Sequence, residues 1–326
     1  MVNFWQLNSA PIIALAPMDD VTDTVFREII LSVSDPQRLH VLFTEFTSTE
    51  GICHPKGSVK AMERLMVNES ELALLKSKEC KLVAQIWGGD PEKFYRSAGI
   101  ISSMGLFDGI DINMGCPVKK VLRNKTCSAL IGYPELAKDI VYATMAGSSL
   151  PVSVKTRIGV KEIITEAWIA QLLETKPSAI TIHGRTQKMM SKGLALWDEI
   201  AKAVMLRDAV NSNTVILGNG DVCSYEDGLT RVRDFGVDGV MVGTGIFKNP
   251  WMFSDESEIT IQHRLDLLNK HIATFERTWK NTKNYNILKR FYKIYLKGFD
   301  GAAEWRDLVM KANGYREVEV LVGQMK

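Results

Sequence analysis

Short apolar runs rich in β-branched residues recur along the first three quarters of the chain, with helix-length sequence between them. The runs are Ile12 to Ala16, Val41 to Phe46, Leu82 to Ile86, Gly109 to Ile112, Val152 to Val154, Ala179 to Ile182, Val215 to Leu217 and Gly239 to Val242. Continuous apolar strands indicate burial on both faces, as in a parallel sheet. Eight such runs predict an α/β fold of the (β/α)8 or TIM barrel type. A doubly wound open sheet is the alternative, although no GxGxxG follows the first run.

The pattern changes to helical periodicity after the eighth run. Apolar residues then recur at three- and four-residue steps, at Leu265, Leu268, Ile272 and Phe275. The stretches Leu288–Lys297 and Ala302–Lys311 are also predicted to be helices. We therefore expect residues 1–252 to form the catalytic barrel and residues 253–326 to form a small all-helical domain.

Composition limits the class of protein. The chain has 326 residues, of which 46% are hydrophobic and 24% charged, and this is typical of a soluble globular protein. Neither a signal peptide nor a membrane span is visible, so we expect a cytoplasmic location and no membrane partner. The five cysteines are scattered without a CxxC pair, which argues against a disulfide framework and a zinc site. A monomer without a bound metal is expected.

Charge is distributed unevenly along the chain. Residues 261–297 contain nine Lys or Arg against Asp266 and Glu276, a net charge of +7, while the rest of the chain carries −5. A positive cluster confined to one segment favours a surface that binds a polyanion such as RNA. A solvated helix face is the alternative. Trp279, Tyr292 and Tyr295 of this segment are expected in the helical core rather than stacked on bases.

Polar residues follow every predicted strand. In a (β/α)8 barrel the catalytic groups lie on the loops after the strands. In chain order these positions hold Pro17 and Met18, Glu45, Gln85, Asn113 with Cys116, Lys155 with Arg157, His183 with Arg185, Asn219 with Asp221, and Gly243 with Gly245. Loops are polar in any protein, but eight such positions in register favour an active site.

The last two strand ends are rich in glycine. Gly218–Asp221 and Gly243–Gly245 offer backbone amides that a phosphate can approach closely, although glycine is also an ordinary turn residue. Lys155 can place a cation against a phosphate or an electron-rich ring, and Gln85 can hydrogen-bond the edge of a heterocycle. Together these residues favour a phosphorylated cofactor.

Cys116 follows the fourth strand in a turn that Gly115 and Pro117 fix, so its thiol is expected to face the barrel mouth. A free thiol has a pKa near 8.5 and is mostly protonated at neutral pH, so it can act as a general acid. Among the other cysteines, Cys127 is interpreted as a polar-loop residue and Cys223 as a packed one. His183 is interpreted as functional because it lies on the ring of strand ends, although a structural role is the common one for a single histidine.

Several motifs together resemble one family. They are Ala16-Pro17-Met18 with Val21-Thr22-Asp23 and Phe26-Arg27, then Asn113 to Pro117, Val154 to Gly159, His183 to Thr186, Gly218 to Asp221, Asn249-Pro250-Trp251, and Tyr295 to Gly298. In this order they resemble the tRNA-dihydrouridine synthases, over nearly the whole chain.

The resemblance implies a flavoprotein oxidoreductase of tRNA processing. FMN bound at the mouth and reduced by NADPH would deliver hydride to C6 of a D-loop uridine, and Cys116 would give the proton to C5. Flavin contacts would fall on Pro17, Met18, Gln85, Lys155, His183, Asn219, Asp221, Gly243, Thr244 and Gly245. Asn113, Arg157 and Arg185 would face the substrate, and Lys289, Arg290 and Lys293 would bind tRNA.

Three places depart from the family pattern. Asp20 stands where glycine is usual, Lys125-Thr126-Cys127 replaces a small Gly/Ala-rich loop, and Thr244 stands where arginine is expected beside the flavin phosphate. Lys248 is the candidate to supply the missing charge. Two alternatives stay open: an FMN barrel that reduces a small pyrimidine or enone, and a flavin-free RNA-binding barrel.

Overall fold

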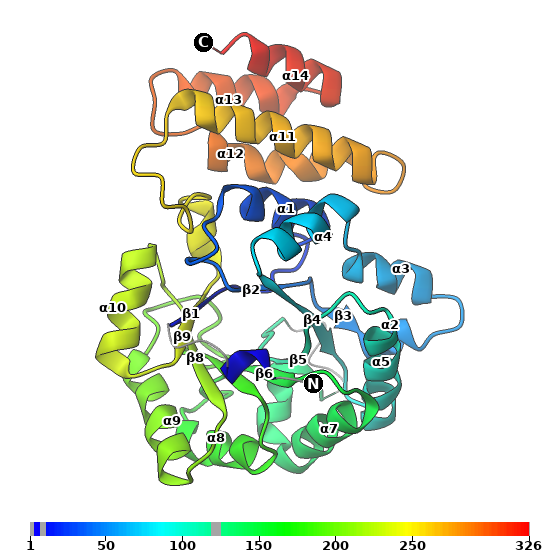
Figure 1. Cartoon of the computed structure of the whole chain (residues 1–326), viewed down its shortest axis with the longest axis vertical. Coiled ribbons are helices and arrows are strands. Elements are labelled where there is room, and N and C mark those ends of the chain that lie inside the picture. Colours follow the sequence, from blue (N-terminus) through cyan, green and yellow to red (C-terminus); the bar gives the residue numbers. More distant parts are fainter. Residues whose placement is uncertain (1–2, 7–10, 119–124, 326) are drawn as a thin grey trace.

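Eight parallel strands close into a barrel in the computed structural model, which describes residues 3–6, 11–118 and 125–325 (Figure 1). The strands are β1 (Ile12–Leu15), β2 (Val41–Phe43), β4 (Lys81–Trp87), β5 (Gly109–Met114), β6 (Val152–Arg157), β7 (Ala179–His183), β8 (Val215–Asn219) and β9 (Gly239–Val242). β1 pairs with both β2 and β9, and β2 pairs with β4, so the ring has no free edge. The predicted (β/α)8 barrel is confirmed, and the open sheet is excluded.

The predicted second strand, residues 41–46, is interrupted. After β2 the chain leaves the ladder and returns as β3 (Thr47–Ser48), which pairs with the far end of β4. The hydroxyl of Thr44 accepts a hydrogen bond from the Gln85 amide at 3.1 Å and replaces the missing backbone partner. This break leaves Glu45 outside the ladder.

The strands bury two different hydrophobic faces. Inward residues form one cluster: Phe4, Trp5, Ile12, Ala14, Ala16, Val41, Phe43, Val83, Ala179, Val215, Leu217 and Met241. The alternate residues, such as Ile13 and Leu15 of β1, belong to the larger cluster between strands and helices. Both faces of the strands are buried, which explains why the strands are continuously apolar. A 3-10 helix, η1 (Phe4–Gln6), places Phe4 and Trp5 in the inner cluster at the N-terminal end of the barrel.

Helices surround the ring of strands. They are α1 (Thr24–Val33), α2 (Thr49–Ile52), α3 (Ser58–Met62), α4 (Glu69–Ser77), α5 (Pro91–Ser103), α7 (Pro134–Gly147), α8 (Thr165–Glu174), α9 (Trp197–Ala209) and α10 (Tyr225–Phe235), with 3-10 turns η2 (Glu63–Leu65), η3 (Cys127–Gly132) and η4 (Thr244–Phe247). Capping defines several ends. The Asp23 carboxylate accepts from the Phe26 amide at the start of α1, and Gly236 closes α10 in the left-handed conformation. None of the described helices is both long and apolar enough to cross a membrane.

The C-terminal quarter is helical, as predicted. It contains α11 (Ile261–Trp279), η5 (Tyr285–Phe291), α12 (Tyr292–Tyr295), α13 (Ala302–Lys311) and α14 (Tyr315–Gly323). The four periodic residues of α11 are buried, and so are Trp279, Tyr292 and Tyr295, which confirms their core position. The stretch predicted to be helical over 288–297 is helical through Tyr295, with η5 as a 3-10 helix over its first part and α12 after it. α14 was not predicted, and the boundary after residue 252 stays a prediction.

The C-terminal helices pack on the barrel through α1, as Figure 1 shows. Phe26 of α1 stacks on Phe291 with ring centroids 5.2 Å apart. Around this contact, Lys283 pairs with Asp23 at 2.9 Å. Arg290 donates to the Asp20 carbonyl at 2.7 Å. Basic residues of the +7 segment therefore also fasten the helices to the loop after β1.

Candidate active site

The inward residues change from apolar to polar at the C-terminal ends of the strands. The polar ones are Glu45, Gln85, Asp111, Asn113, Lys155, Arg157, His183 and Asn219. β8 shows the change within one strand, since Val215 and Leu217 belong to the inner cluster and Asn219 follows at the mouth. Because all the strands are parallel, these side chains meet at one end of the barrel.

A cavity of about 290 Å³ opens at this end. Every predicted cofactor residue except Gln85 lines it: Pro17, Met18, Lys155, His183, Asn219, Asp221, Gly243, Thr244 and Gly245. Arg185, Cys223 and Lys248 line it as well, whereas Gln85 is fully buried and lies outside the lining. The lining comes from the ends of β1, β6, β7, β8 and β9, so the residues predicted from sequence line the same cavity. Their contact with a cofactor stays a prediction.

Lys155 supplies a positive charge inside the barrel. Its Nζ donates to Asn219 Oδ1 at 3.0 Å, and Asn219 Nδ2 donates to the Met241 carbonyl at 2.7 Å. Burial lowers the pKa of Lys155 to about 8, assisted by the nearby charge of Arg157. The ammonium group therefore remains mostly protonated at neutral pH, and among the described residues it forms no ion pair with an acidic side chain.

His183 is held neutral beside a bound arginine. Burial, together with the charges of Lys155, Arg157 and Arg185, lowers its pKa to about 2. Arg185 Nη1 lies 3.0 Å from His183 Nε2, and because arginine can only donate, this nitrogen is the acceptor. Arg185 Nη2 also donates to both carboxylate oxygens of Asp221, at 2.7 and 2.8 Å. Its guanidinium thus orders the site, and its predicted contact with substrate stays untested.

The turn after β5 is held by side chains. Asn113 Oδ1 accepts from the Gly115 and Cys116 amides, each at 3.0 Å. Arg157 Nε donates to the Gly115 carbonyl at 2.6 Å, and its Nη1 donates to the Met190 carbonyl at 2.8 Å. Both residues were predicted to face a substrate. In the structure they fix the loop that carries Cys116, which leaves the predicted substrate contacts untested.

Cys116 is half-buried and has a second thiol beside it. A hydrogen bond from the Cys127 thiol lowers the pKa of Cys116 to about 7, against the effect of burial and with help from the Val118 amide. Ser128 Oγ donates to the Cys116 carbonyl at 2.7 Å and ties η3 to the turn. The interpretation of Cys127 as a polar-loop residue was wrong, because η3 folds its side chain inward. Cys223 was also wrongly placed: it is exposed at the cavity, 3.3 Å from Lys248 Nζ.

Comparison with known proteins settles the family. The model of the family described as dihydrouridine synthase matches residues 14–324. The chain belongs to the dihydrouridine synthase family. It is similar to a probable tRNA-dihydrouridine synthase of Staphylococcus aureus (strain MRSA252), with 41% identity over 99% of this chain and 96% of that protein. It is also similar to probable tRNA-dihydrouridine synthase 2 of Bacillus subtilis (strain 168), at 41% identity over 98% of this chain and 95% of that protein.

Solved structures of low sequence identity also match. Morphinone reductase in complex with tetrahydroNAD has 10% identity and a TM-score of 0.48, with 74% of this chain and 84% of that chain covered. An old yellow enzyme homologue from Zymomonas mobilis has 13% identity and a TM-score of 0.49, with 75% of this chain and 87% of that chain covered.

Two departures of this member of the dihydrouridine synthase family have a backbone explanation. Asp20 has a φ of 55°, and Lys125 and Cys127 each have a φ of 53°. This left-handed region favours glycine, which was expected at the position of Asp20 and within the loop at 125–127, and aspartate is one of the few other residues that tolerate it. The Asp20 amide also donates to Glu45 Oε1 at 2.7 Å. Asp20 therefore adopts a left-handed backbone conformation and also places a carboxylate near the mouth.

Arg64 is a mouth residue that sequence reasoning missed. It forms ion pairs with Asp19, with Glu45 at 3.0 Å and with Asp20 at 3.5 Å. Among the described residues, these three acidic groups are the ones that lie close enough together to share a metal ion. The guanidinium of Arg64 contacts all three and offsets part of their negative charge. Arg64 follows no predicted strand, so no signal in the sequence pointed to it.

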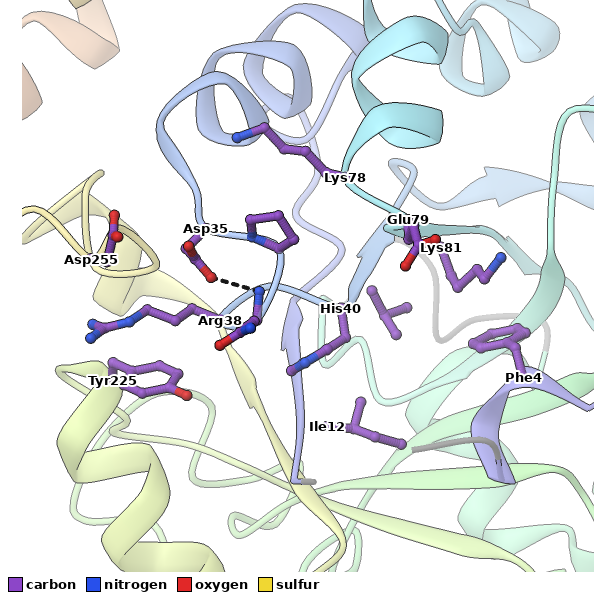
Figure 2. Close-up of a pocket in the computed structure, with 13 residues that line it drawn as sticks. Phe4, Ile12, Asp35, Arg38, His40, Lys78, Glu79, Lys81, Tyr225 and Asp255 are labelled. Atoms are coloured by element: carbon purple, nitrogen blue, oxygen red, sulfur yellow. Dashed lines mark hydrogen bonds between the residues drawn. The ribbon is translucent and has the colours of Figure 1, made fainter. Parts of the chain in front are cut away.

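A larger hollow lies at the opposite end of the barrel in this dihydrouridine synthase family member. It measures about 860 Å³ and is lined by residues at the N-terminal ends of β1, β2 and β4 (Figure 2). Its polar groups serve local structure: Arg38 lies 4.6 Å from the centre of the Tyr225 ring, and His40 Nδ1 accepts from the Ile13 amide at 3.1 Å. Catalytic groups in this fold belong at the other end. The mouth with Cys116 is therefore the candidate active site.

Proposed function

We propose that this protein reduces the C5–C6 double bond of uridines in the D-loop of tRNA to dihydrouridine, with FMN bound at the mouth and NADPH as the reductant. Family membership supports the reaction class, and relatives with 41% identity are named as probable tRNA-dihydrouridine synthases. The observation that carries the proposal is a half-buried thiol of lowered pKa, Cys116, on the same barrel mouth as the cationic cavity.

The residues present fit a phosphorylated flavin. A Cβ added to Gly243 would meet only the Ala16 Cβ, at 3.9 Å, so the missing side chain leaves space in the cavity lining. Thr244 and Lys248 line the same space, so Lys248 can supply the charge of the absent arginine near the phosphate. Lys155 and Asn219 would lie against the ring system. The bound flavin would supply the hydride, and the protein would hold it and exclude water.

Cys116 is the proposed proton donor. Its thiol would protonate C5, and the resulting thiolate would be stabilised by the hydrogen bond from Cys127. A general acid works best with a pKa near the working pH, and a value of about 7 meets that condition. The reactive form is the protonated thiol, so uridine reduction is expected to decline as the pH rises through this value.

The +7 segment is the proposed tRNA contact. A uridine must leave its stack to reach the mouth, which costs a few kcal/mol, and phosphate contacts elsewhere offset that cost. Lys293 is exposed, and Lys289 is half-buried with its Nζ 5.8 Å from the Tyr285 ring centre. Arg290 is exposed although one of its nitrogens binds the Asp20 carbonyl. These three residues belong to the proposed tRNA-binding surface, and Arg290 connects that surface to the loop after β1.

The decisive experiment is nucleoside mass spectrometry of tRNA from a strain lacking the gene, with each lost dihydrouridine mapped to its position. Purified protein should be yellow and should oxidise NADPH when unmodified tRNA is added. A colourless protein that binds tRNA would favour the flavin-free alternative. Rapid reduction of a free pyrimidine or enone, with no salt-sensitive tRNA binding, would favour the small-molecule reductase.

A further inference from the structure

Asp111 is a buried carboxylate beneath the Cys116 turn. It lies on the inward face of β5 and is fully buried. Its Oδ1 accepts from Ser153 Oγ at 2.6 Å, and its Oδ2 accepts from Gln85 Nε2 at 2.7 Å. Both of these partners are neutral. A carboxylate whose two hydrogen-bond partners are neutral is costly to bury.

The carboxyl group is largely ionised at neutral pH. Burial raises its pKa to about 6, and the hydrogen bonds from Ser153 and Gln85 and the charge of Lys155 oppose a larger rise. An ionised carboxylate can only accept hydrogen bonds. Both neighbours must therefore present donors to Asp111.

This requirement determines the orientation of Gln85. The two ends of a glutamine amide have nearly the same shape but opposite hydrogen-bonding roles. With Nε2 bound to Asp111, the Gln85 Oε1 accepts from Asn113 Nδ2 at 3.0 Å. The reversed amide would place an oxygen against the carboxylate and a nitrogen against the Asn113 nitrogen, which would break both contacts.

The orientation of Asn113 is likewise tied to the turn that carries Cys116. Since Asn113 Nδ2 donates to Gln85, its Oδ1 is free to accept from the backbone amides of Gly115 and Cys116, at 3.0 Å each. A reversed Asn113 would present donors to these two donors. The chain of contacts is thus fixed at both ends, by a carboxylate that only accepts hydrogen bonds and by two backbone amides that only donate.

We propose that Asp111 is a positioning residue: as a group that only accepts hydrogen bonds, it anchors the buried end of the chain through Gln85 and Asn113 and thereby holds the turn that carries Cys116. The effect on uridine reduction rests on the proposed function. The effect on the turn itself does not.

The main test replaces the carboxylate by an amide of the same shape, Asp111→Asn, in the full-length protein. The new amide must turn its oxygen toward Gln85 and its nitrogen toward Ser153, so the chain exchanges a strong hydrogen bond to a charged acceptor for a weaker neutral one. Iodoacetamide should label Cys116 about 3- to 10-fold faster, the factor that one weakened hydrogen bond gives to local opening. Uridine reduction should fall about 10- to 100-fold, because displaced catalytic groups lose that much. The melting temperature should stay equal or rise, since a buried charge is removed.

Ser153→Ala is the matched control. It also removes one hydrogen bond from Asp111, but the carboxylate still accepts from Gln85, so labelling of Cys116 should stay at the wild-type rate. A rescue variant combines Asp111→Asn with Gln85→Glu. The buried negative charge is kept, the new carboxylate accepts from Asn113, and the new amide donates to it. Labelling should return to the wild-type rate, whether or not this variant still binds flavin.

Three results would overturn the proposal. One is wild-type labelling and turnover in Asp111→Asn, the second is an equal effect in Ser153→Ala, and the third is a folded double variant that labels as fast as Asp111→Asn. If Asp111→Asn does not fold, the double variant is compared with the wild type: labelling at the wild-type rate supports the proposal, and labelling at least 3-fold faster overturns it. Labelling requires neither flavin nor tRNA, so it stays informative even if the wild-type protein makes no dihydrouridine.

Discussion

The two ends of the barrel are built from the same eight strands, but one has an apolar interior and the other a polar one. At the N-terminal end Phe4, Trp5, Ile12 and Val215 fill the interior with apolar groups. At the C-terminal end the inward positions are polar, buried and in part charged. Apolar burial stabilises, whereas buried polar groups at best recover their desolvation through hydrogen bonds. The N-terminal end, which we call the closed end, therefore stabilises the fold. The C-terminal end, which we call the open end, holds the candidate active site. The two ends should therefore respond differently to mutation.

The largest effect is expected at the open end, from Cys116→Ala. Loss of the proton donor should lower dihydrouridine formation by about 10²- to 10⁴-fold, the usual contribution of a positioned general acid. Flavin reduction by NADPH should remain intact, because the thiol has no part in it. Stopped-flow absorbance and nucleoside analysis separate the two steps, with Cys53→Ala as the control. Normal uridine reduction by Cys116→Ala would remove this thiol from the mechanism.

Trp5→Ala tests the closed end. Removal of this buried ring should lower the free energy of unfolding by about 3 kcal/mol or more, as large-to-small core substitutions do. The protein that remains folded should keep its turnover number, since Trp5 lies far from the mouth. Urea unfolding measures the first quantity and steady-state kinetics the second, and Gln6→Ala on the same turn serves as an exposed control. A normal stability with reduced turnover would contradict the division of roles.

A moderate effect is expected at the helical surface. Lys289→Glu with Lys293→Glu should weaken tRNA binding about 10-fold at low salt and should flatten its salt dependence, because fewer counterions are released. Neither residue docks the helices on the barrel as Lys283 does through Asp23. The melting temperature should therefore stay the same. Reversal of Lys192 and Lys188 on the loop after β7 provides a charge-matched comparison, and equal losses in both variants would mean that only net charge matters.

The smallest effect is expected from Cys127→Ala, which tests what sets the pKa of Cys116 at the open end. Cys127→Ala removes the hydrogen bond that lowers the pKa of Cys116 to about 7, so that pKa should rise by up to about one unit toward the value of a free thiol. The protonated thiol donates, so activity is present below the pKa and lost above it. The alkaline limb of the pH–rate profile should therefore move to higher pH. An unmoved limb would show that Cys127 does not tune this thiol.

Much of the barrel was predictable from the sequence, because strand burial and turn chemistry are local properties. The runs at Gly109, Ala179 and Gly239 begin the observed strands at those same residues. Gly115 and Pro117 marked the turn of Cys116. Polar residues after apolar runs indicated the mouth, since parallel strands bring their ends together whatever the loops between them do.

The tertiary structure decided which side chains meet. Nothing in the spacing of the chain places the thiol of Cys127 beside Cys116 or directs Arg185 to Asp221 and Arg157 to Gly115. These contacts depend on how the loops fold over the mouth. The sequence by itself determined where the strands and reactive groups lie along the chain, because these features repeat over a few residues. Their orientation, partners and pKa values came from packing between distant segments, where a shift of a few ångströms makes or breaks a hydrogen bond.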